Sequence, residues 1–482
     1  SAASDVYKRQ VYSSILTVSG YLFPFITFPY VTRVLGVENF GICSFYDSIL
    51  TYFTLISMMG MSTLGIREIA SCKGDKDKLC SVFSSLFSLN LIATVIALLL
   101  MLGSALFVNK FQEHPQMMLI GAAKLLANFF MIEWFFRGIE EFQYVTVRSI
   151  LVRAVYVVSV FIFVRQSEDY LLYFLLTALM FVVNAAINML YVRRFVTLTF
   201  SNIRITNYIR PFIVFGAYQI LTSMYTSFNV AYLGFVSSDT EVGYYSSSVK
   251  LFNILLSFYT AFTGVLLPRM SSLYHSGDLN GFNKLLLLSF KVLVFIVFPI
   301  IILSEFYAPE IVTIMSGSSF GGAVLPMRII MPLLLIIGIE QILVYQILIP
   351  QNKDQKVFVN SIVGGLIGVI ANLILVKELG SSGSAVVWLL SEVCVLTMSY
   401  YFTFSIIKGI PILRIIIKRI IYSIPLIFFL AFLKAEYSGV ISFIVSCLVV
   451  ACYYFIIEMT VDKKSTISIL LPKNLRRNTK DC

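Results

Sequence analysis

Long apolar segments follow one another along this chain from end to end, separated only by short polar loops. A bilayer core of roughly 30 Å needs about 20 apolar residues of α-helix, and about fourteen segments approach that length. Inside lipid the backbone must satisfy its own hydrogen bonds, so each segment is expected to be a helix. The sequence therefore predicts an all-α polytopic membrane protein whose expected spans are residues 11–35, 41–66, 81–107, 116–136, 149–165, 171–192, 209–236, 244–268, 285–306, 326–350, 357–376, 384–406, 417–433 and 439–459.

The composition supports a membrane protein with little chain outside the bilayer. Hydrophobic residues make up 59% of the 482 residues and charged residues only 13%, which is far from the balance of a soluble domain. A net charge of +11 would suggest nucleic-acid binding in a soluble protein. In a membrane protein the positions of the Lys and Arg residues matter more than their sum. We expect no nucleic-acid partner.

The cysteines and histidines give no sign of a metal or a disulfide framework. No CxxC or Cys/His cluster occurs among the seven Cys and two His residues, so we expect packing residues or free thiols and no metal or cofactor. We also expect no cleavable signal peptide, because the first apolar segment is too long and leads directly into further spans. The cysteines are Cys43, Cys72, Cys80, Cys394, Cys447, Cys452 and Cys482.

The distribution of positive charge predicts the orientation. With a cytoplasmic N-terminus, roughly 26 of the Lys and Arg residues fall in cytoplasmic loops and about five in outer loops. Cytoplasmic loops of membrane proteins carry this excess. An even number of spans places both termini on the same side. We therefore expect both termini in the cytoplasm and, for a bacterial protein, a position in the cytoplasmic (inner) membrane.

A weak internal repeat divides the chain into two halves. Four residues recur at a constant offset of 202, and in both halves a Gly opens a span and an Arg closes it. Parallel repeats that flank a central cavity are typical of transporters. We predict a six-helix lobe at residues 1–205, a second at 206–410, and two extra helices with a cytoplasmic tail at 411–482. The matching residues are Gly41, Ser44, Leu64 and Arg67 in the first half and Gly243, Ser246, Leu266 and Arg269 in the second.

Three sequence blocks carry a resemblance to a known family. Residues 24–70 contain Pro-Tyr at 29–30, Arg-Val-Leu-Gly at 33–36, Phe-Gly at 40–41 and Gly-Ile-Arg-Glu-Ile-Ala at 65–70. A second block is EWFFRGIEEF at 133–142, and a third is YQILIPQNK at 345–353. With the number of spans, these blocks resemble the Wzx-type polysaccharide flippases (O-antigen and capsule transporters) of the multidrug/oligosaccharidyl-lipid/polysaccharide exporter superfamily.

The resemblance implies a function, a substrate and partners. It implies a two-lobed bundle that works by alternating access and moves an oligosaccharide linked to undecaprenyl pyrophosphate from the inner to the outer leaflet. It implies contact with membrane lipids, a polysaccharide polymerase and a chain-length regulator as candidate partners, and a monomer. A pyrophosphate that crosses a low-dielectric slab needs a pathway lined by cations.

Charged residues inside the expected spans are the candidate site residues, because a charge in the membrane interior is costly unless it faces a polar cavity or a partner. For each of them the alternative is a purely structural pairing or a position at the membrane surface. Glu340 and Glu392 lie mid-span, where they either pair with a cation or carry a proton or sodium ion. The candidates for substrate binding are Arg33, Lys124, Arg153 and Lys250, and those for gating or ion coupling are Asp47, Glu340 and Glu392.

The repeat suggests a gate. Asp47 lies six residues after Gly41, and Lys250 lies seven after Gly243. If the two lobes are related by a pseudo-twofold axis, Asp47 and Lys250 form an ion pair that closes the outer side. The alternative is that water solvates each charge separately at the cavity mouth.

Three other functions compete with polysaccharide-lipid flipping. A multidrug or cation antiporter of the same superfamily would need acidic residues in the first lobe, where only Asp47 lies against Lys124 and Arg153. A peptidoglycan-precursor flippase handles similar chemistry and fits the charges equally well. A membrane polymerase or glycosyltransferase needs a long extramembrane loop or a carboxylate-rich face. No loop exceeds about 20 residues, and no Walker, HExxH or complete GxSxG motif is present, so we expect a transporter and not an enzyme.

Overall fold

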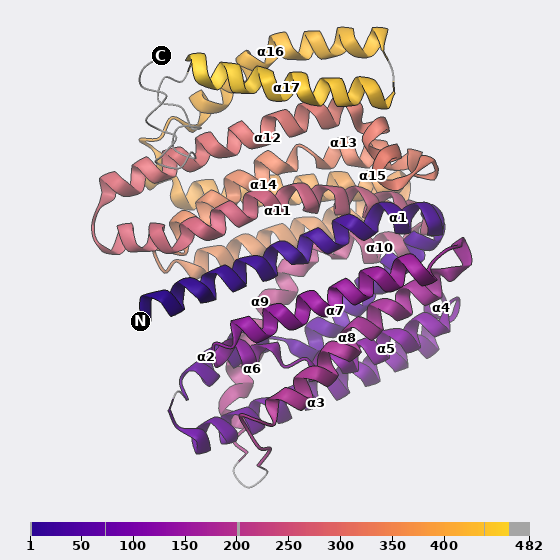
Figure 1. Ribbon diagram of the computed structural model, residues 1–482, viewed down its shortest axis with the longest axis vertical. Helices are drawn as coiled ribbons and strands as arrows, with labels where there is room; N and C mark the ends of the chain where they lie inside the picture. The colour runs from indigo at the N-terminus through magenta and orange to yellow at the C-terminus, as the bar shows by residue number, and fades with distance from the viewer. Residues whose placement is uncertain (1, 73, 200–202, 438, 462–482) are drawn as a thin grey trace. The chain divides into compact units, whose positions relative to one another are not determined.

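The computed structural model describes residues 2–72, 74–199, 203–437 and 439–461, and every regular element within these ranges is helical. The all-α prediction is confirmed. The expected tail, with Cys482, lies outside the described residues. In chain order (Figure 1), the elements are α1 (Ala2–Met58), α2 (Met61–Ala70), α3 (Lys76–Phe107), α4 (Asn109–Gln112), α5 (Pro115–Phe130), α6 (Glu133–Gly138), α7 (Phe142–Phe163), η1 (Ser167–Asp169), α8 (Tyr170–Val192), α9 (Thr206–Thr226), α10 (Phe228–Val236), α11 (Asp239–His275), α12 (Leu279–Ser316), η2 (Ser318–Ala323), α13 (Val324–Ile330), α14 (Leu333–Gln341), η3 (Ile342–Leu348), α15 (Asp354–Ile407), α16 (Ile412–Glu436) and α17 (Val440–Val461).

Ten helices of the described chain are long and apolar enough to cross a membrane, or eleven if a pair bent by 44° counts as one span. The protein is therefore a multi-pass membrane protein. α1, with 57 residues, would be about 85 Å long if straight, which is more than one span needs. It is broken at Gly36 (φ 73°, ψ 175°), and the 54-residue α15 is broken at Gly380 (φ 55°, ψ −132°). Each of these two helices thus covers two expected spans, while the total of fourteen remains a prediction.

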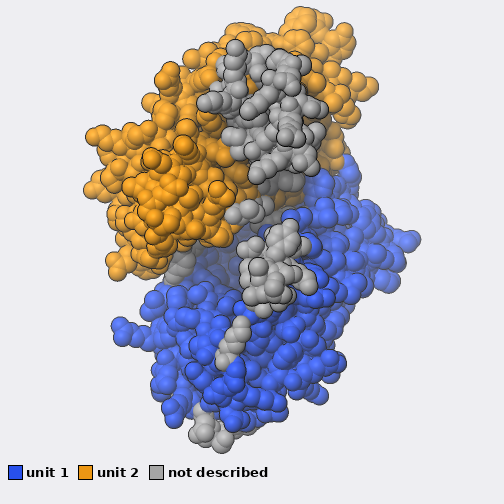
Figure 2. Space-filling view, turned by 60° about the vertical axis from the view of Figure 1, so that its left-hand side comes forward, with its two compact units in different colours: residues 1–247, 364–387 blue, residues 248–363, 388–482 orange. Residues whose placement is uncertain are grey.

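The chain forms two compact units, coloured separately in Figure 2. Unit 1 comprises residues 1–247 and 364–387, and unit 2 comprises residues 248–363 and 388–482. Within unit 1, α1 packs against α3 and α7, and α5 packs against α8; within unit 2, α12 contacts α13, α14, α16 and α17. The lobes expected at residues 1–205, 206–410 and 411–482 remain a prediction.

The first two family-like blocks of the sequence lie against each other in unit 1, where α2 packs on α6. A Cβ atom on Gly65 would lie 2.6 Å from the Trp134 ring, and one on Gly138 would lie 2.7 Å from the Ile69 side chain. Both positions therefore need the absence of a side chain. The short helices α2 and α6 form a platform beside the longer helices of unit 1.

The glycines of the repeat also meet within unit 1. A Cβ atom on Gly41 would lie 1.8 Å from the carbonyl oxygen of Asp239, and one on Gly243 would lie 2.2 Å from that of Val37. Val37 and Asp239 are themselves 202 residues apart, so the two contacts are equivalent under the repeat. Such reciprocal contacts are expected where two helices are related by a pseudo-twofold axis, here between the start of α11 and the second part of α1. Small residues allow two membrane helices to approach this closely.

Candidate functional site

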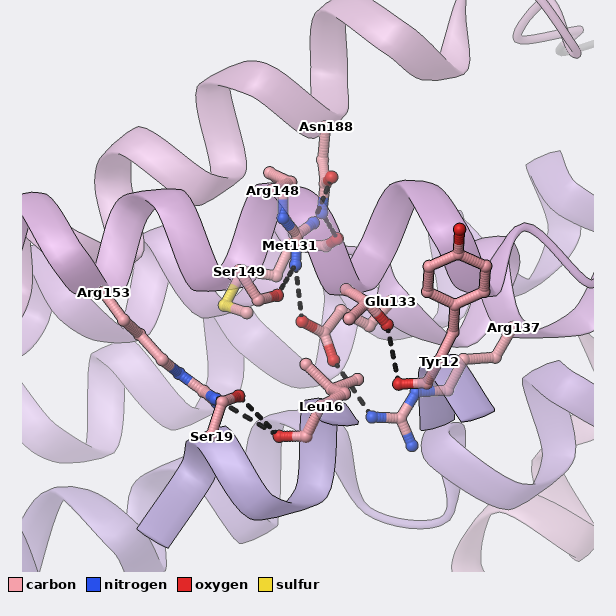
Figure 3. Close-up of polar contacts among 11 residues, drawn as sticks. Tyr12, Leu16, Ser19, Met131, Glu133, Arg137, Arg148, Ser149, Arg153 and Asn188 are labelled. Carbon is pink, nitrogen blue, oxygen red and sulfur yellow. Dashed lines mark hydrogen bonds and ion pairs between the residues drawn. The ribbon is translucent and has the colours of Figure 1, made fainter. Parts of the chain in front are cut away.

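A cluster of charged residues in unit 1 begins at the break between α5 and α6. Ile132, the N-cap of α6, has a left-handed backbone (φ 38°), and the chain turns there so that Glu133 opens α6. The Glu133 carboxylate accepts a hydrogen bond from Arg148 Nη2 at 2.7 Å and lies 3.4 Å from Arg137 Nη2 (Figure 3). One carboxylate therefore contacts two guanidinium groups from α6 and α7.

Arg148 is buried, and its other partners fix its position. Its guanidinium donates to Asn188 Oδ1 and, at 3.0 Å, to Ser149 Oγ. The Asn188 side chain on α8 is fully buried and donates in turn to the carbonyl oxygen of Met131 in the α5–α6 break. Figure 3 shows this chain of contacts, which joins α6, α7 and α8 around the break.

Arg153, five residues after Arg148 on α7, is bound differently. Its Nη1 donates to Ser19 Oγ at 2.8 Å and to the carbonyl oxygen of Leu16 at 3.4 Å, both on α1 (Figure 3). A Cβ atom on Gly20 would lie 3.7 Å from Nη1, an ordinary van der Waals distance, so Gly20 lies beside the guanidinium. The hydrogen-bond acceptors of Arg153 among the described residues are neutral oxygens. We call Arg137, Arg148, Arg153 and Glu133 the arginine cluster; it contains three cations and one anion.

Lys124 on α5 forms the second charged group of unit 1. Its Nζ lies 2.5 Å from Asp47 Oδ1, and the Lys124 side chain is 12% exposed against 57% for Asp47. The rings of Phe174 and Phe181 on α8 lie 5.6 and 5.1 Å from Nζ, within the range of cation–π attraction. The ion pair expected between Asp47 and Lys250 remains a prediction, while Asp47 is already engaged by Lys124.

The other candidates lie on several elements. Arg33 is exposed on α1, and Lys250 is exposed on α11. Glu340 on α14 and Glu392 on α15 interact with each other in unit 2. The structure thus brings Asp47 to Lys124 and Glu340 to Glu392. No group of three or more His, Cys, Asp or Glu side chains that could hold a metal ion occurs among the described residues.

The sequence interpretation missed three members of the polar network. Arg148 was assigned to a cytoplasmic loop because the expected span began at residue 149, whereas α7 begins at Phe142. Arg137 was also treated as a loop residue, and Asn188 was not singled out. Two signals were present: the i,i+4 spacing of Glu133 and Arg137, and two Asn residues, Asn184 and Asn188, in the apolar run of α8, where an amide needs a partner.

The fold matches solved structures whose titles describe a flippase and a multidrug transporter. The solved structure titled "Lipid II flippase MurJ, inward closed conformation" superposes with a TM-score of 0.76, covering 93% of this chain and 97% of that chain at 12% identity. An inward-facing multidrug resistance MATE family transporter of the MOP superfamily gives a TM-score of 0.60 over 82% of this chain and 99% of that chain, at 14% identity. These likenesses show the fold.

The chain belongs to the family described as "Polysaccharide biosynthesis protein", which matches residues 6–274, more than half of the chain. A protein of Escherichia coli (strain K12) named "Putative O-antigen transporter" is 27% identical over 404 residues, covering 82% of this chain and 96% of its own length. A protein of the same name from Shigella dysenteriae is 25% identical over 388 residues, covering 78% of this chain and 94% of its own. The resemblance to the polysaccharide flippases is confirmed. These relatives and structural neighbours are named as transporters or flippases, in line with the expectation that the chain is not an enzyme.

Proposed function

We propose that this protein flips oligosaccharide repeat units linked to undecaprenyl pyrophosphate from the inner to the outer leaflet of the bacterial cytoplasmic membrane by alternating access. The observation that carries the proposal is the arginine cluster, which contains three guanidinium groups and one carboxylate within helices that cross the membrane; two of the guanidinium groups contact the carboxylate, and that of Arg153 does not. Family membership and the MurJ-like fold support the same function.

The arginine cluster suits a pyrophosphate. A guanidinium binds phosphate oxygens through two parallel hydrogen bonds, and these charge-assisted bonds are about twice as strong as neutral ones. Arg153 is bonded to a hydroxyl and a carbonyl group, so it gains a stronger partner when an anion arrives. Arg148 is already bound to Glu133 and Asn188, so its role is to hold the cluster together.

Lys124 offers a second position at which the protein could bind the anionic substrate during its transfer across the membrane. An anionic substrate that approaches Lys124 competes with Asp47, whose carboxylate is more than half exposed to the surroundings. Exchange of one anionic partner for another leaves no unpaired charge in the membrane. Arg33 and Lys250, both exposed, complete the proposed set of cations.

The remaining expectations belong to the same proposal. Both termini lie in the cytoplasm, and the protein acts as a monomer surrounded by membrane lipids, with a polysaccharide polymerase and a chain-length regulator as partners and no nucleic acid. A peptidoglycan-precursor flippase is the second candidate, because the MurJ structure gives a TM-score of 0.76.

The test replaces Arg153 with Gln and, separately, with Lys in a strain that depends on this protein for its surface polysaccharide. Because a hydrogen bond to a charged group contributes about 1.5–3 kcal/mol, we expect Arg153→Gln to reduce export about tenfold or more at unchanged membrane protein levels. Arg153→Lys keeps the charge but not the bidentate geometry, so an intermediate loss is expected. Arg165→Gln, at an exposed position just after α7, is the matched control and should export normally.

Two results would contradict the proposal. One is full export by the triple variant Arg33→Gln/Lys124→Gln/Arg153→Gln. The other is that the protein restores growth to cells depleted of their peptidoglycan-precursor flippase but not surface polysaccharide to the export-deficient strain, which would favour the second candidate.

A further inference from the structure

The span of unit 2 that contains α13, α14 and η3 is irregular at two places. The helical segments 318–330 and 333–348 are bent by 44° relative to each other, and Ile342–Leu348 form the π-helix η3. In a π-helix each backbone hydrogen bond spans one residue more than in an α-helix, and such turns are rare and frequently lie at functional sites. The Ile349 N–H donates to the Val344 carbonyl oxygen at 3.0 Å, which closes the last of these wide turns.

A buried glutamine lies within this π-helix. Gln346 is 0% exposed, and neither Nε2 nor Oε1 of its amide has a hydrogen-bond partner among the described residues. The buried amides of Asn90, Asn360 and Asn372 differ, because each of them donates at least one hydrogen bond from Nδ2. An amide that is buried without partners destabilises the conformation that buries it. η3 therefore combines an unusual backbone with an unfavourable side-chain environment.

The helix just before η3 is fixed to its neighbours in unit 2. Gln341, at the end of α14, donates from Nε2 to Thr260 Oγ1 at 3.0 Å, and its Oε1 accepts a hydrogen bond from Thr263 Oγ1 at 3.2 Å. Both threonines lie on α11. A Cβ atom on Gly338 would lie 2.2 Å from the Leu293 side chain of α12, so α14 also packs closely on α12. A change in η3 would therefore displace the residues that follow it and leave α14 in place.

The wide turns of η3 give the span a second possible arrangement. An α-helix turns by about 100° per residue. Conversion of η3 to an α-helix therefore rotates the residues after it by about this angle relative to α14. The same conversion carries the Gln346 amide away from its present position, where it has no partner among the described residues. One change thus removes both unfavourable features of the segment.

We propose that η3 is a conformational switch, which is π-helical in this state and α-helical in another state of the transport cycle, where the Gln346 amide gains hydrogen-bond partners. In the predicted orientation, the loop at residues 349–353 lies on the cytoplasmic side. The switch therefore moves the cytoplasmic end of this span while α14 stays fixed. The role in transport rests on the proposed flippase function, so the two conformations and export are tested separately.

The unpaired amide is tested by thermal unfolding of the purified full-length protein in detergent. Gln346→Met should raise the unfolding temperature by about 2 °C or more, because Met is also unbranched and needs no hydrogen-bond partner. Gln341→Met is the matched control: the same exchange five residues earlier removes the two bonds to α11 and should lower the unfolding temperature. A lower unfolding temperature for Gln346→Met would show that this amide already has partners, and it would overturn the proposal.

The second conformation is tested by deletion of Tyr345, whose side chain is 43% exposed. The deletion removes the extra residue of the wide turns and keeps the residues on both sides in register, so that a continuous α-helix forms. Hydrogen exchange of residues 342–350 should be about tenfold or more faster in the wild-type protein than in the deletion variant, because a segment that changes conformation opens its hydrogen bonds. Residues 333–341 should exchange equally in both proteins. Equal exchange of residues 342–350 would overturn the switch.

The role in transport is tested by export of surface polysaccharide in cells. Gln346→Met and the deletion of Tyr345 should each reduce export about tenfold at unchanged membrane protein levels, because each favours one of the two conformations. Tyr345→Ala, which keeps the extra residue and removes only the ring, is the control and should export normally. Full export by the deletion variant beside the expected exchange would overturn the role in transport alone. Arg153→Gln should leave the exchange of residues 342–350 unchanged, so failure of one proposal does not hide the other.

Discussion

At the scale of single residues, the membrane interior imposes pairing on almost every charge that the helices bury. Arg419 on α16 lies 2.9 Å from Glu458 on α17, and both side chains are buried. Lys434 on α16 lies 3.2 Å from Glu310 on α12. Arg153 stands apart because its acceptors are neutral. Cations that already pair with a carboxylate, such as Arg419 and Lys434, hold helices together. Among the described residues Arg153 has only neutral acceptors, so it can still bind an anion.

Arg148 should be a structural residue of the arginine cluster. Its removal breaks the hydrogen bonds that the guanidinium donates to Glu133, Asn188 and Ser149, and a hydrogen bond of a charged group contributes about 1.5–3 kcal/mol. We therefore expect Arg148→Gln to lower the thermal unfolding temperature of the protein in detergent markedly. Arg137→Gln is the control, since the Arg137 side chain is 42% exposed and such pairs contribute about 0–1 kcal/mol. Equal stability of the two variants would contradict the assignment.

Lys110 on α4 allows a test that depends on pH. Burial acts to lower the pKa of Lys110, but hydrogen bonds and attraction to Glu113 and Asp239 outweigh it, so the pKa is raised. A raised pKa means that the stabilisation is fully present below the unfolded value of about 10.4 and is lost as the pH rises through the folded value. Lys110→Gln should thus lower the unfolding temperature by the same amount from pH 6 to pH 9. Above about pH 10.5 the difference between the two proteins should shrink; a difference that grows there would contradict the prediction.

The sequence predicted Lys124 and Arg153 as charges within the membrane, but it could not give their partners. The partner of Lys124 is 77 residues away, and that of Arg153 is 134 residues away on α1. Hydropathy locates a charge along the membrane normal and contains no information about which neighbouring helix it faces. For the same reason the sequence placed Glu340 and Glu392 mid-span without indicating that they interact.

At the scale of elements, breaks within the long helices determine where polar groups such as free backbone N–H groups and their acceptors lie. The second part of α15 begins after Gly380, where the Glu241 carboxylate accepts a hydrogen bond of 2.7 Å from the Ser381 N–H. A free N–H at a helix start is stabilised by such an acceptor, and a carboxylate also complements the helix dipole. Hydropathy predicted an interruption near residue 380, because loops and breaks both interrupt apolar runs. It could not predict that the chain turns within a single residue.

Gly380→Ala should be destabilising by about 1–3 kcal/mol, because its positive φ strains an L-residue. The added Cβ would also lie 2.6 Å from Glu241 Oε2 and displace the cap. Gly103→Ala in α3 is the matched control, since no atom lies within 4 Å of its added Cβ; there Ala should stabilise the helix by about 0.5–1 kcal/mol. Thermal unfolding in detergent measures the stability change of each variant. Unfolding temperatures that move in the same direction in both variants would contradict the prediction.

At the scale of the whole molecule, the distribution of Lys and Arg predicts the orientation in the membrane. A green fluorescent protein fused at the C-terminus should fluoresce, and an alkaline phosphatase fused at the same point should be inactive, because that enzyme needs the periplasm to form its disulfides. Fusions in the loop after α7, beside Arg165, should give the opposite pattern. Phosphatase activity of the C-terminal fusion would contradict the orientation.

The reciprocal contact of Gly41 and Gly243 has a consequence for how this chain can evolve. The spacing of the two helices is set by the larger of the residues at the crossing, so a side chain gained at either position removes the close approach for both. A substitution at either position therefore affects the same contact, so selection acts jointly on the two codons, which are 202 apart in the chain. Neither position is therefore free to gain a side chain alone.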